Sequence, residues 1–144
     1  MSKPILLLDF DGVCHSYVSG WQGATEINDP PVPFMFNWLW VYKDHFEIHV
    51  LSSRSNEPGG IYAMQAWFGR YWREWTNPKQ SSQEVLNDVY PQSGCPLWIH
   101  FPKEKPAAFV TLDDRAITFT GRWPQVDELK NFKPWYKSGT VGGE

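Results

Sequence analysis

The sequence contains little cysteine, no long apolar run and no block of like charge. Its only cysteines, Cys14 and Cys95, form no Cys-x-x-Cys motif, so neither a disulfide scaffold nor a zinc site is indicated. Two free thiols in a reducing compartment are the simpler interpretation. No apolar stretch is long enough to span a membrane, and no basic-then-apolar signal peptide is present. We therefore expect a cytoplasmic protein with no membrane partner.

Charge and composition narrow the possible classes of protein further. The net charge is −3, without runs of one sign, which argues against a broad basic surface for duplex nucleic acid but leaves room for a small basic pocket. A chain of 144 residues with 42% hydrophobic and 20% charged residues predicts one folded domain. We assign it to residues 1–137, followed by a flexible tail at 138–144.

Short apolar runs alternate with helical spacing along the chain. Strand-like runs cover residues 4–10, 46–52, 97–101 and 108–113, with a fifth, alternating run at 116–120. Helical patterns cover residues 34–45, 60–75, 82–90 and 126–132. This alternation predicts an α/β fold with a Rossmann-like, doubly wound parallel sheet in three α/β/α layers. Between the first strand and the first helix, Gly20 and Gly23 suit a small hairpin flap within residues 13–33.

Polar and charged side chains follow three of the expected strands. The apolar run at residues 5–8 stops on Asp9 and Asp11, followed by Gly12. The second run ends on Ser52, Ser53 and Arg54, and the fourth on Asp113, Asp114 and Arg115. Because ligands bind at the carboxyl ends of parallel strands, we expect these side chains to share one site. Together with Lys103 or Lys105, they supply a nucleophile, an acid/base, a hydroxyl, a cation and metal-binding carboxylates, which is the inventory for phosphoryl transfer.

These motifs resemble those of the haloacid dehalogenase superfamily of phosphohydrolases. The shared pattern is a strand ending in Asp-x-Asp-Gly, a strand ending in Ser or Thr, a Lys, and a strand ending in paired Asp, and all four occur here in order. The Ser-x-Arg at 52–54 and the Asp-Asp-Arg at 113–115 also resemble, more weakly, the phosphatase half of polynucleotide kinase-phosphatases. The Lys close before the paired Asp is similar to small bacterial and phage members.

The resemblance implies a role for each residue. Asp9 attacks phosphorus and forms an aspartyl phosphate, and Asp11 protonates the leaving alcohol and later activates water. Mg²⁺ is held by Asp9, the main-chain carbonyl of Asp11, and Asp113, with Asp114 a direct or water-mediated helper. Ser52 donates to a phosphoryl oxygen, and Lys105 neutralises charge there. An acid two positions after the nucleophile points to a phosphatase or phosphomutase rather than a dehalogenase.

Several of these assignments have alternatives. Lys103 competes with Lys105, and Ser53 should face away from Ser52 because adjacent strand residues point to opposite faces. Arg54 and Arg115 either bind substrate or pair with a nearby acid, and the ion pair is the simpler interpretation. Trp21 either stacks on a base or covers the edge of the sheet. His15 follows the Asp-x-Asp-Gly turn, where a solvent-facing loop position is expected; the histidines, at 15, 45, 49 and 100, share no metal-like spacing.

The sequence thus predicts a Mg²⁺-dependent phosphomonoesterase without a cap domain. An open site of this kind would take a phosphorylated small molecule, a nucleotide or a nucleic-acid end, and a second copy of the chain could close it. The alternative is a non-catalytic module that binds a phosphate ligand or nucleotide on the same fold. A paired nucleophile and acid, Asp9 and Asp11, favours the enzyme, because a binding module needs neither.

Overall fold

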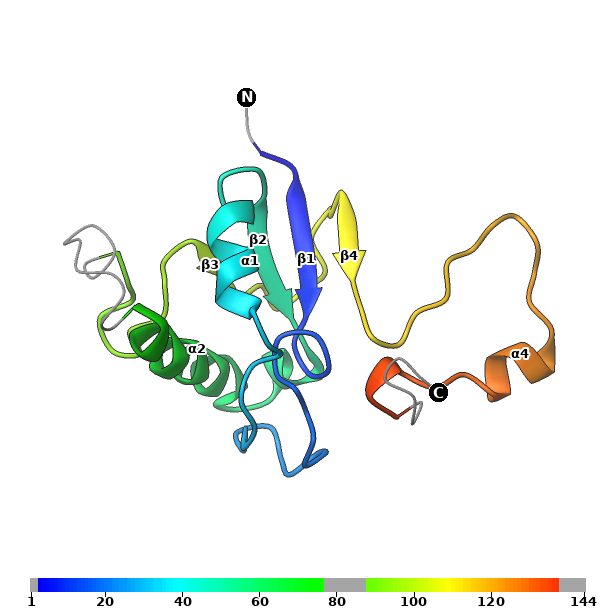
Figure 1. The fold of residues 1–144 in the computed structure, drawn as a ribbon, viewed down its shortest axis with the longest axis horizontal. Coiled ribbons are helices and arrows are strands. Elements are labelled where there is room, and N and C mark those ends of the chain that lie inside the picture. The colour runs from blue at the N-terminus through cyan, green and yellow to red at the C-terminus, as the bar shows by residue number, and fades with distance from the viewer. Residues whose placement is uncertain (1–2, 77–87, 138–144) are drawn as a thin grey trace.

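A short, all-parallel sheet carries the fold. The computed structural model describes residues 3–76 and 88–137. The strands β1 (Ile5–Asp9), β2 (Glu47–Leu51), β3 (Ile99–His100) and β4 (Val110–Leu112) lie in the order β3-β2-β1-β4 (Figure 1). Each neighbouring pair is parallel, with Leu8 opposite both Val50 and Leu112. The α/β class with a parallel sheet, and the four strands predicted from apolar runs, are confirmed.

Two helices, α1 (Met35–Tyr42) and α2 (Gly60–Thr76), cover one face of this sheet. Their inward residues join those of β1 and β2 in a single core cluster. On α2 the buried Met64, Trp67, Phe68 and Trp72 recur at spacings of three, one and four, as an amphipathic helix requires. Phe36 of α1 packs edge-on against Phe68 and Trp72 of α2. Burying side chains of this size contributes about 1.5–3 kcal/mol each, so this aromatic layer stabilises the packing of the two helices.

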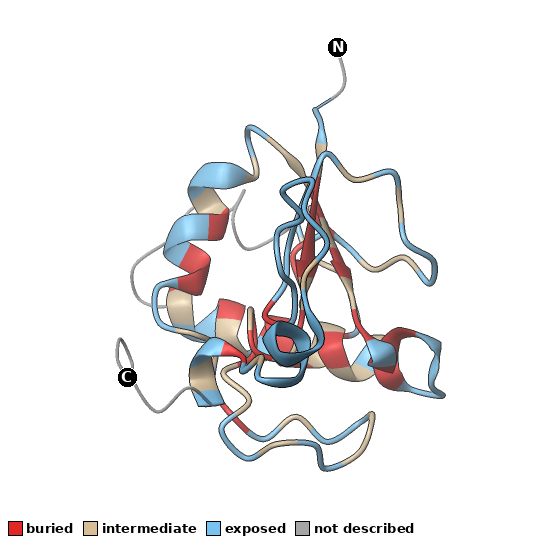
Figure 2. Cartoon of the chain, turned by 90° about the vertical axis from the view of Figure 1, so that its right-hand side faces the viewer, coloured by how far each residue is buried: buried red, intermediate tan, exposed pale blue. Residues whose placement is uncertain are grey.

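The predicted three-layer arrangement is not seen in the residues described. Residues 101–109 connect β3, at one edge of the sheet, to β4, at the other, without forming a helix. Beyond β4 the chain leaves the sheet as an arm, residues 116–133, that contains the short helix α4 (Val126–Lys130). The 3-10 turn η2 (Trp135–Lys137) follows the arm. Figure 2 shows buried residues in the sheet and the helix surfaces turned toward it, and exposed residues along the arm.

Two further predictions about local structure differ from what is found. The alternating run at 116–120 is not a strand, and its Ile117 and Phe119 are exposed. Alternation alone does not make a strand, because the backbone also needs a hydrogen-bonding partner, and residues 116–120 pair with no strand of the described sheet. The loop with Gly20 and Gly23 contains turns instead of paired strands, and only a bridge between His15 and Pro31 closes its base. Of the helix expected over 82–90, residues 82–87 lie outside the described residues.

Candidate active site

The residues that follow three strands meet in one pocket at the carboxyl edge of the sheet. The pocket has a volume of about 290 Å³. Asp9 comes from the end of β1, Ser52 and Ser53 follow β2, and Asp113 and Asp114 follow β4. The remaining lining residues come from loops and from η2, the C-terminal turn at Trp135–Lys137. They are Asp11, Tyr17, Trp21, Arg115 and Tyr136. The sheet topology therefore brings together most of the residues selected from the sequence.

Three carboxylates in this pocket form a site that could bind a metal ion. Asp9, Asp113 and Asp114 each offer an oxygen, and these oxygens lie within 4.8 Å of one another. Asp114 is buried, and neither of its carboxylate oxygens has a hydrogen-bond partner among the described residues. The nearest cation is Arg115, whose Nε lies 3.9 Å from Asp114 Oδ2. A buried carboxylate without a partner is costly, so a bound cation would complete this cluster.

Burial and the neighbouring carboxylates disfavour the charged form of Asp9. Burial, followed by hydrogen-bonding proximity to Asp114 and the charges of Asp114 and Asp113, raises the pKa of Asp9 to about 8. Without a cation, part of the Asp9 population would therefore be protonated at neutral pH, and a protonated carboxyl is a poor nucleophile. A divalent cation would reverse this shift, because it favours the charged form of every carboxylate around it.

The Asp11 carboxylate is held in place by two basic side chains. Arg54 donates to it at two points, from Nε to Oδ2 at 3.0 Å and from Nη2 to Oδ1 at 3.1 Å. The Nδ1 atom of His15 lies 2.9 Å from Oδ1. Burial alone raises the pKa of Asp11, but the hydrogen bonds from His15 and Arg54 and their charges outweigh it and lower the pKa. The side chain of Asp11 is thus fixed and charged, and it is not part of the three-carboxylate cluster.

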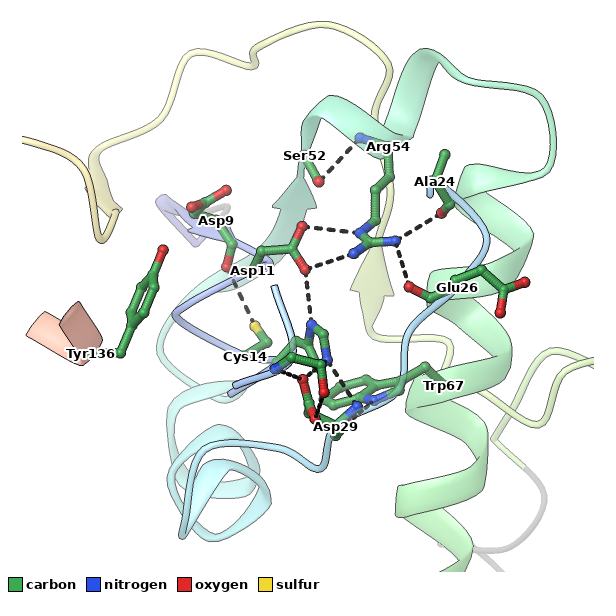
Figure 3. A network of polar contacts seen from close by, with 12 residues as sticks. Asp9, Asp11, Cys14, Ala24, Glu26, Asp29, Ser52, Arg54, Trp67 and Tyr136 are labelled. Carbon is green, nitrogen blue, oxygen red and sulfur yellow. Dashed lines mark hydrogen bonds and ion pairs between the residues drawn. The ribbon is translucent and has the colours of Figure 1, made fainter. Parts of the chain in front are cut away.

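His15 is buried, contrary to the solvent-facing position expected from the sequence. Only 1% of the residue is exposed. Its Nε2 accepts a hydrogen bond from the Asp29 backbone N–H at 3.1 Å, so Nδ1 carries the proton that is donated to Asp11. Trp67 in turn donates to the Asp29 carbonyl at 2.9 Å (Figure 3). The signal in the sequence was the spacing of four residues from Asp11 across a tight turn, in which the His15 N–H bonds back to the Phe10 carbonyl.

Arg54 is fully buried, and each of its three guanidinium nitrogens donates a hydrogen bond within the protein. Besides Asp11, it donates from Nη1 to the carbonyls of Gly23, Ala24 and Glu26 at 2.8, 3.0 and 3.3 Å. The ring of Trp21 covers its guanidinium at 4.7 Å. Arg54 therefore ties the loop to Asp11, and the geometry favours the ion pair over the predicted contact with substrate.

Trp21 takes a position different from both sequence-based alternatives, over the guanidinium of Arg54. It covers this ion pair instead of the sheet edge, and it remains 49% exposed at the pocket.

Close backbone contacts explain why Arg54 can sit so deep. The turn η1 (Ser53–Asn56) begins directly after β2, with the Ser52 hydroxyl accepting from the Arg54 N–H at 3.1 Å. Gly60, the first residue of α2, packs against the Arg54 carbonyl, and a Cβ at that position would collide with it. This arrangement leaves the Ser52 hydroxyl proton available to a ligand in the pocket.

Ser53 also lines the pocket, although it was expected to face away. The strand alternation that separates adjacent side chains stops at Leu51, and the 3-10 turn brings both serines to the same side. Neither Lys103 nor Lys105 lines the pocket; both are exposed. The Lys103 carbonyl accepts from Asn56 Nδ2 at 2.9 Å, which holds that segment beside η1. The basic side chain that does line the pocket is Arg115.

The C-terminal turn contributes residues that sequence reasoning missed. The Trp135 indole donates to the Gly12 carbonyl at 2.7 Å, across 123 positions of sequence. Tyr136 lines the pocket, and its hydroxyl accepts from Arg115 Nη2 at 3.2 Å. Gly12, at φ 87°, leaves the space that Asp114 and Tyr136 occupy, since a Cβ there would overlap both. No local pattern in the sequence links this turn to the Asp-x-Asp-Gly motif.

Comparisons with family models, with curated proteins and with solved structures give no match to this chain. No helix among the residues that the structure describes is long and apolar enough to cross a membrane. Both cysteines are buried free thiols, in line with the interpretation of the sequence.

Proposed function

We propose that this protein is a Mg²⁺-dependent phosphomonoesterase that acts through an aspartyl phosphate on Asp9. The observation that carries the proposal is the buried Asp114 carboxylate beside Asp9 and Asp113, whose oxygens have no hydrogen-bond partner among the described residues. Oxygen ligands of this kind suit a hard cation such as Mg²⁺ better than zinc. Asp9, Asp113 and Asp114 would hold the ion, with the Asp11 carbonyl as the haloacid dehalogenase resemblance implies. When bound, it would neutralise charge on the carboxylates and the phosphoryl group.

The first step would use Asp9 as the nucleophile. One of its carboxylate oxygens attacks phosphorus, the bond from phosphorus to the leaving oxygen breaks, and that oxygen takes up the proton that Asp11 carries at this step and regains in the next. The Ser52 hydroxyl can donate to a phosphoryl oxygen, because its own accepted hydrogen bond comes from the Arg54 N–H. Arg115, the basic residue that lines the pocket among the described residues, would balance the same charge, in the role that the resemblance assigned to Lys105.

The second step would release phosphate and restore Asp9. A water oxygen attacks phosphorus, its proton passes to Asp11, and the bond from phosphorus to Asp9 breaks. The donors around Asp11 lower its pKa and keep it charged, which suits this role as a base better than the earlier role as an acid. His15 and Arg54 fix the direction of the carboxylate, so their contribution would be positional.

The same resemblance suggests a doubly wound core and an open, capless site. In the described residues the pocket is bordered by the loop that carries Tyr17 and Trp21 and by the C-terminal turn. Such a pocket would admit a nucleotide, another phosphorylated small molecule or a nucleic-acid end.

The test is release of inorganic phosphate from an aryl phosphate by the full chain, with Mg²⁺ and with a chelator. We expect turnover that depends on the metal and that disappears on chelation. Full activity in chelator would contradict the metal assignment. Binding of phosphate ligands without any turnover would instead favour the second candidate, a phosphate-binding module on the same fold.

A further inference from the structure

Three aromatic side chains line the parts of the pocket wall that do not come from the strand ends. Tyr17 and Trp21 come from the loop after β1, and Tyr136 comes from the C-terminal turn. The acids and serines follow the strands, so the pocket combines a polar floor with aromatic walls. A phosphate held over Asp9 and Asp114 would direct the rest of its ester toward these rings.

The surroundings of Tyr136 hold it in one place. Its ring meets that of Tyr17 edge-on, with centroids 5.9 Å apart and planes at 88°. Its hydroxyl accepts from Arg115, and the neighbouring Trp135 is bonded to Gly12. In the view of Figure 3, Tyr136 lies on the Asp9 side of the site and Arg54 on the other side of Asp11. The turn is therefore a fixed wall, brought to the site from the far end of the chain.

Tyr17 is also held in an unusual position. Its backbone has φ 62°, in the left-handed region that a bulky side chain seldom adopts. Its ring contacts His15 at 5.8 Å as well as Tyr136, so the ring lies between the buried polar network and the open pocket. Strained backbone that places a side chain at a pocket is typical of a functional site. Trp21, covered on one side by Arg54, leaves its other surface half exposed.

We propose that Tyr17, Trp21 and Tyr136 form a leaving-group subsite for a flat ring. The preferred substrates would then be phosphate monoesters whose alcohol carries an aromatic ring or a base, in preference to open-chain alcohols. Aromatic side chains stack on any planar π system, and each such contact is worth about 5- to 150-fold in affinity. This inference rests on the proposed function, because it needs the phosphate to sit at the three-carboxylate cluster.

Binding of two non-hydrolysable ligands tests the subsite without requiring turnover. We would measure the dissociation constants of phenylphosphonate and methylphosphonate by calorimetry, with Mg²⁺, for the full chain. Wild type should bind phenylphosphonate about 5- to 150-fold more tightly than methylphosphonate. Tyr136→Leu should lose most of that preference, while Tyr136→Phe should keep it. Trp123→Ala is the matched control, because Trp123 is 81% exposed and lies outside this pocket.

Each outcome has a distinct meaning. Equal affinity of wild type for the two ligands, or a preference that survives in Tyr136→Leu, overturns the subsite alone. Absence of binding by either ligand, together with absence of phosphate release, overturns the proposed function and the subsite with it. If Tyr136→Leu does not fold, Trp21→Ala removes a half-exposed ring and should lower the preference in the same way. Phosphotyrosine and adenosine monophosphate, compared with glycerol phosphate, then show which ring is favoured; no preference for either contradicts the inference.

Discussion

Arg54 and Asp11, 43 positions apart in sequence, form a two-point ion pair in which the guanidinium is completely buried. The pair joins the end of β2 to the turn after β1, and the third guanidinium nitrogen fastens the overlying loop. Its effect is to hold the Asp11 carboxylate charged and in a fixed direction at the edge of the pocket. The pair is therefore both a structural fastening and the support of a candidate catalytic group.

Arg54→Leu should lower the free energy of unfolding by about 3–5 kcal/mol, because it leaves Asp11 partly buried without its main partner. Urea denaturation followed by tryptophan fluorescence would measure the change. Arg70→Leu is the matched control, since Arg70 is exposed and its contacts, an ion pair with Glu74 at 3.5 Å and the ring of Tyr71 at 5.0 Å, lie on the same helix. That control should change stability by no more than about 0.5 kcal/mol. Equal effects of the two substitutions would show that the buried pair contributes little.

Asp9→Asn should fold normally and lose phosphatase activity. The amide has nearly the volume of the carboxylate but is a far poorer nucleophile, so turnover should fall by several orders of magnitude. Phosphate release from an aryl phosphate is the assay, and Asp44→Asn is the control, because Asp44 lies on the surface beside Lys43. Turnover near the wild-type rate would remove Asp9 from the role of nucleophile.

Asp11→Asn should affect stability as well as chemistry. It removes the negative charge that Arg54 and His15 share, so we expect a loss of about 3–5 kcal/mol in the free energy of unfolding. In the fraction that stays folded, the aspartyl phosphate should accumulate, because its hydrolysis lacks a base. Mass spectrometry of rapidly quenched reactions would detect the added phosphoryl group. A normal rate of phosphoenzyme breakdown would assign the base to another residue.

His15→Leu should show that the second support of Asp11 matters. The change removes the donor to Asp11 and leaves the Asp29 backbone N–H buried without an acceptor, which costs about 1–3 kcal/mol. His15→Asn keeps an amide donor near the position of Nδ1 and should recover part of the activity, though not the bond from Asp29. Steady-state kinetics of the two variants give the comparison. Identical kcat values for both would mean that the Asp11 contact has no part in turnover.

The sequence predicted the parts of the site that belong to strand ends. Asp9, Ser52, Asp113 and Asp114 each follow an apolar run, and parallel topology brings such ends to one edge of the sheet. The Arg54 pair, the burial of His15 and the position of Tyr136 depend instead on how loops fold over that edge. Tyr136 in particular reaches the site from a turn fastened by an indole-to-carbonyl bond to Gly12 and by contacts with Arg115 and Tyr17, for which the local sequence has no signal.

The three-layer arrangement, which the alternation of strands and helices predicted, is not confirmed in the described residues. Crossover connections between parallel strands are right-handed. Because β1, β2 and β3 are added in one direction, α1 and α2 lie on the same face of the sheet. The return to β4 reverses that direction, and there the chain uses residues 101–109 without a helix. A helical layer on the other face would need a helix in a returning connection such as residues 101–109, and the composition of this segment does not predict one.

Stability without a divalent cation should fall as the pH rises from about 5 to about 9. Asp9 has its ordinary pKa of 3.8 in the unfolded chain and a pKa of about 8 in the folded protein. The folded state therefore holds the proton more tightly. The stability that this proton contributes is fully present below the unfolded pKa and is lost as the pH rises through the folded one.

Mg²⁺ should raise the melting temperature more at about pH 9 than at about pH 5, because it replaces that proton. Asp9→Asn should flatten the pH dependence and weaken the Mg²⁺ effect, whereas Asp44→Asn should change neither. An equal Mg²⁺ effect in wild type and in Asp9→Asn would place the cation away from Asp9.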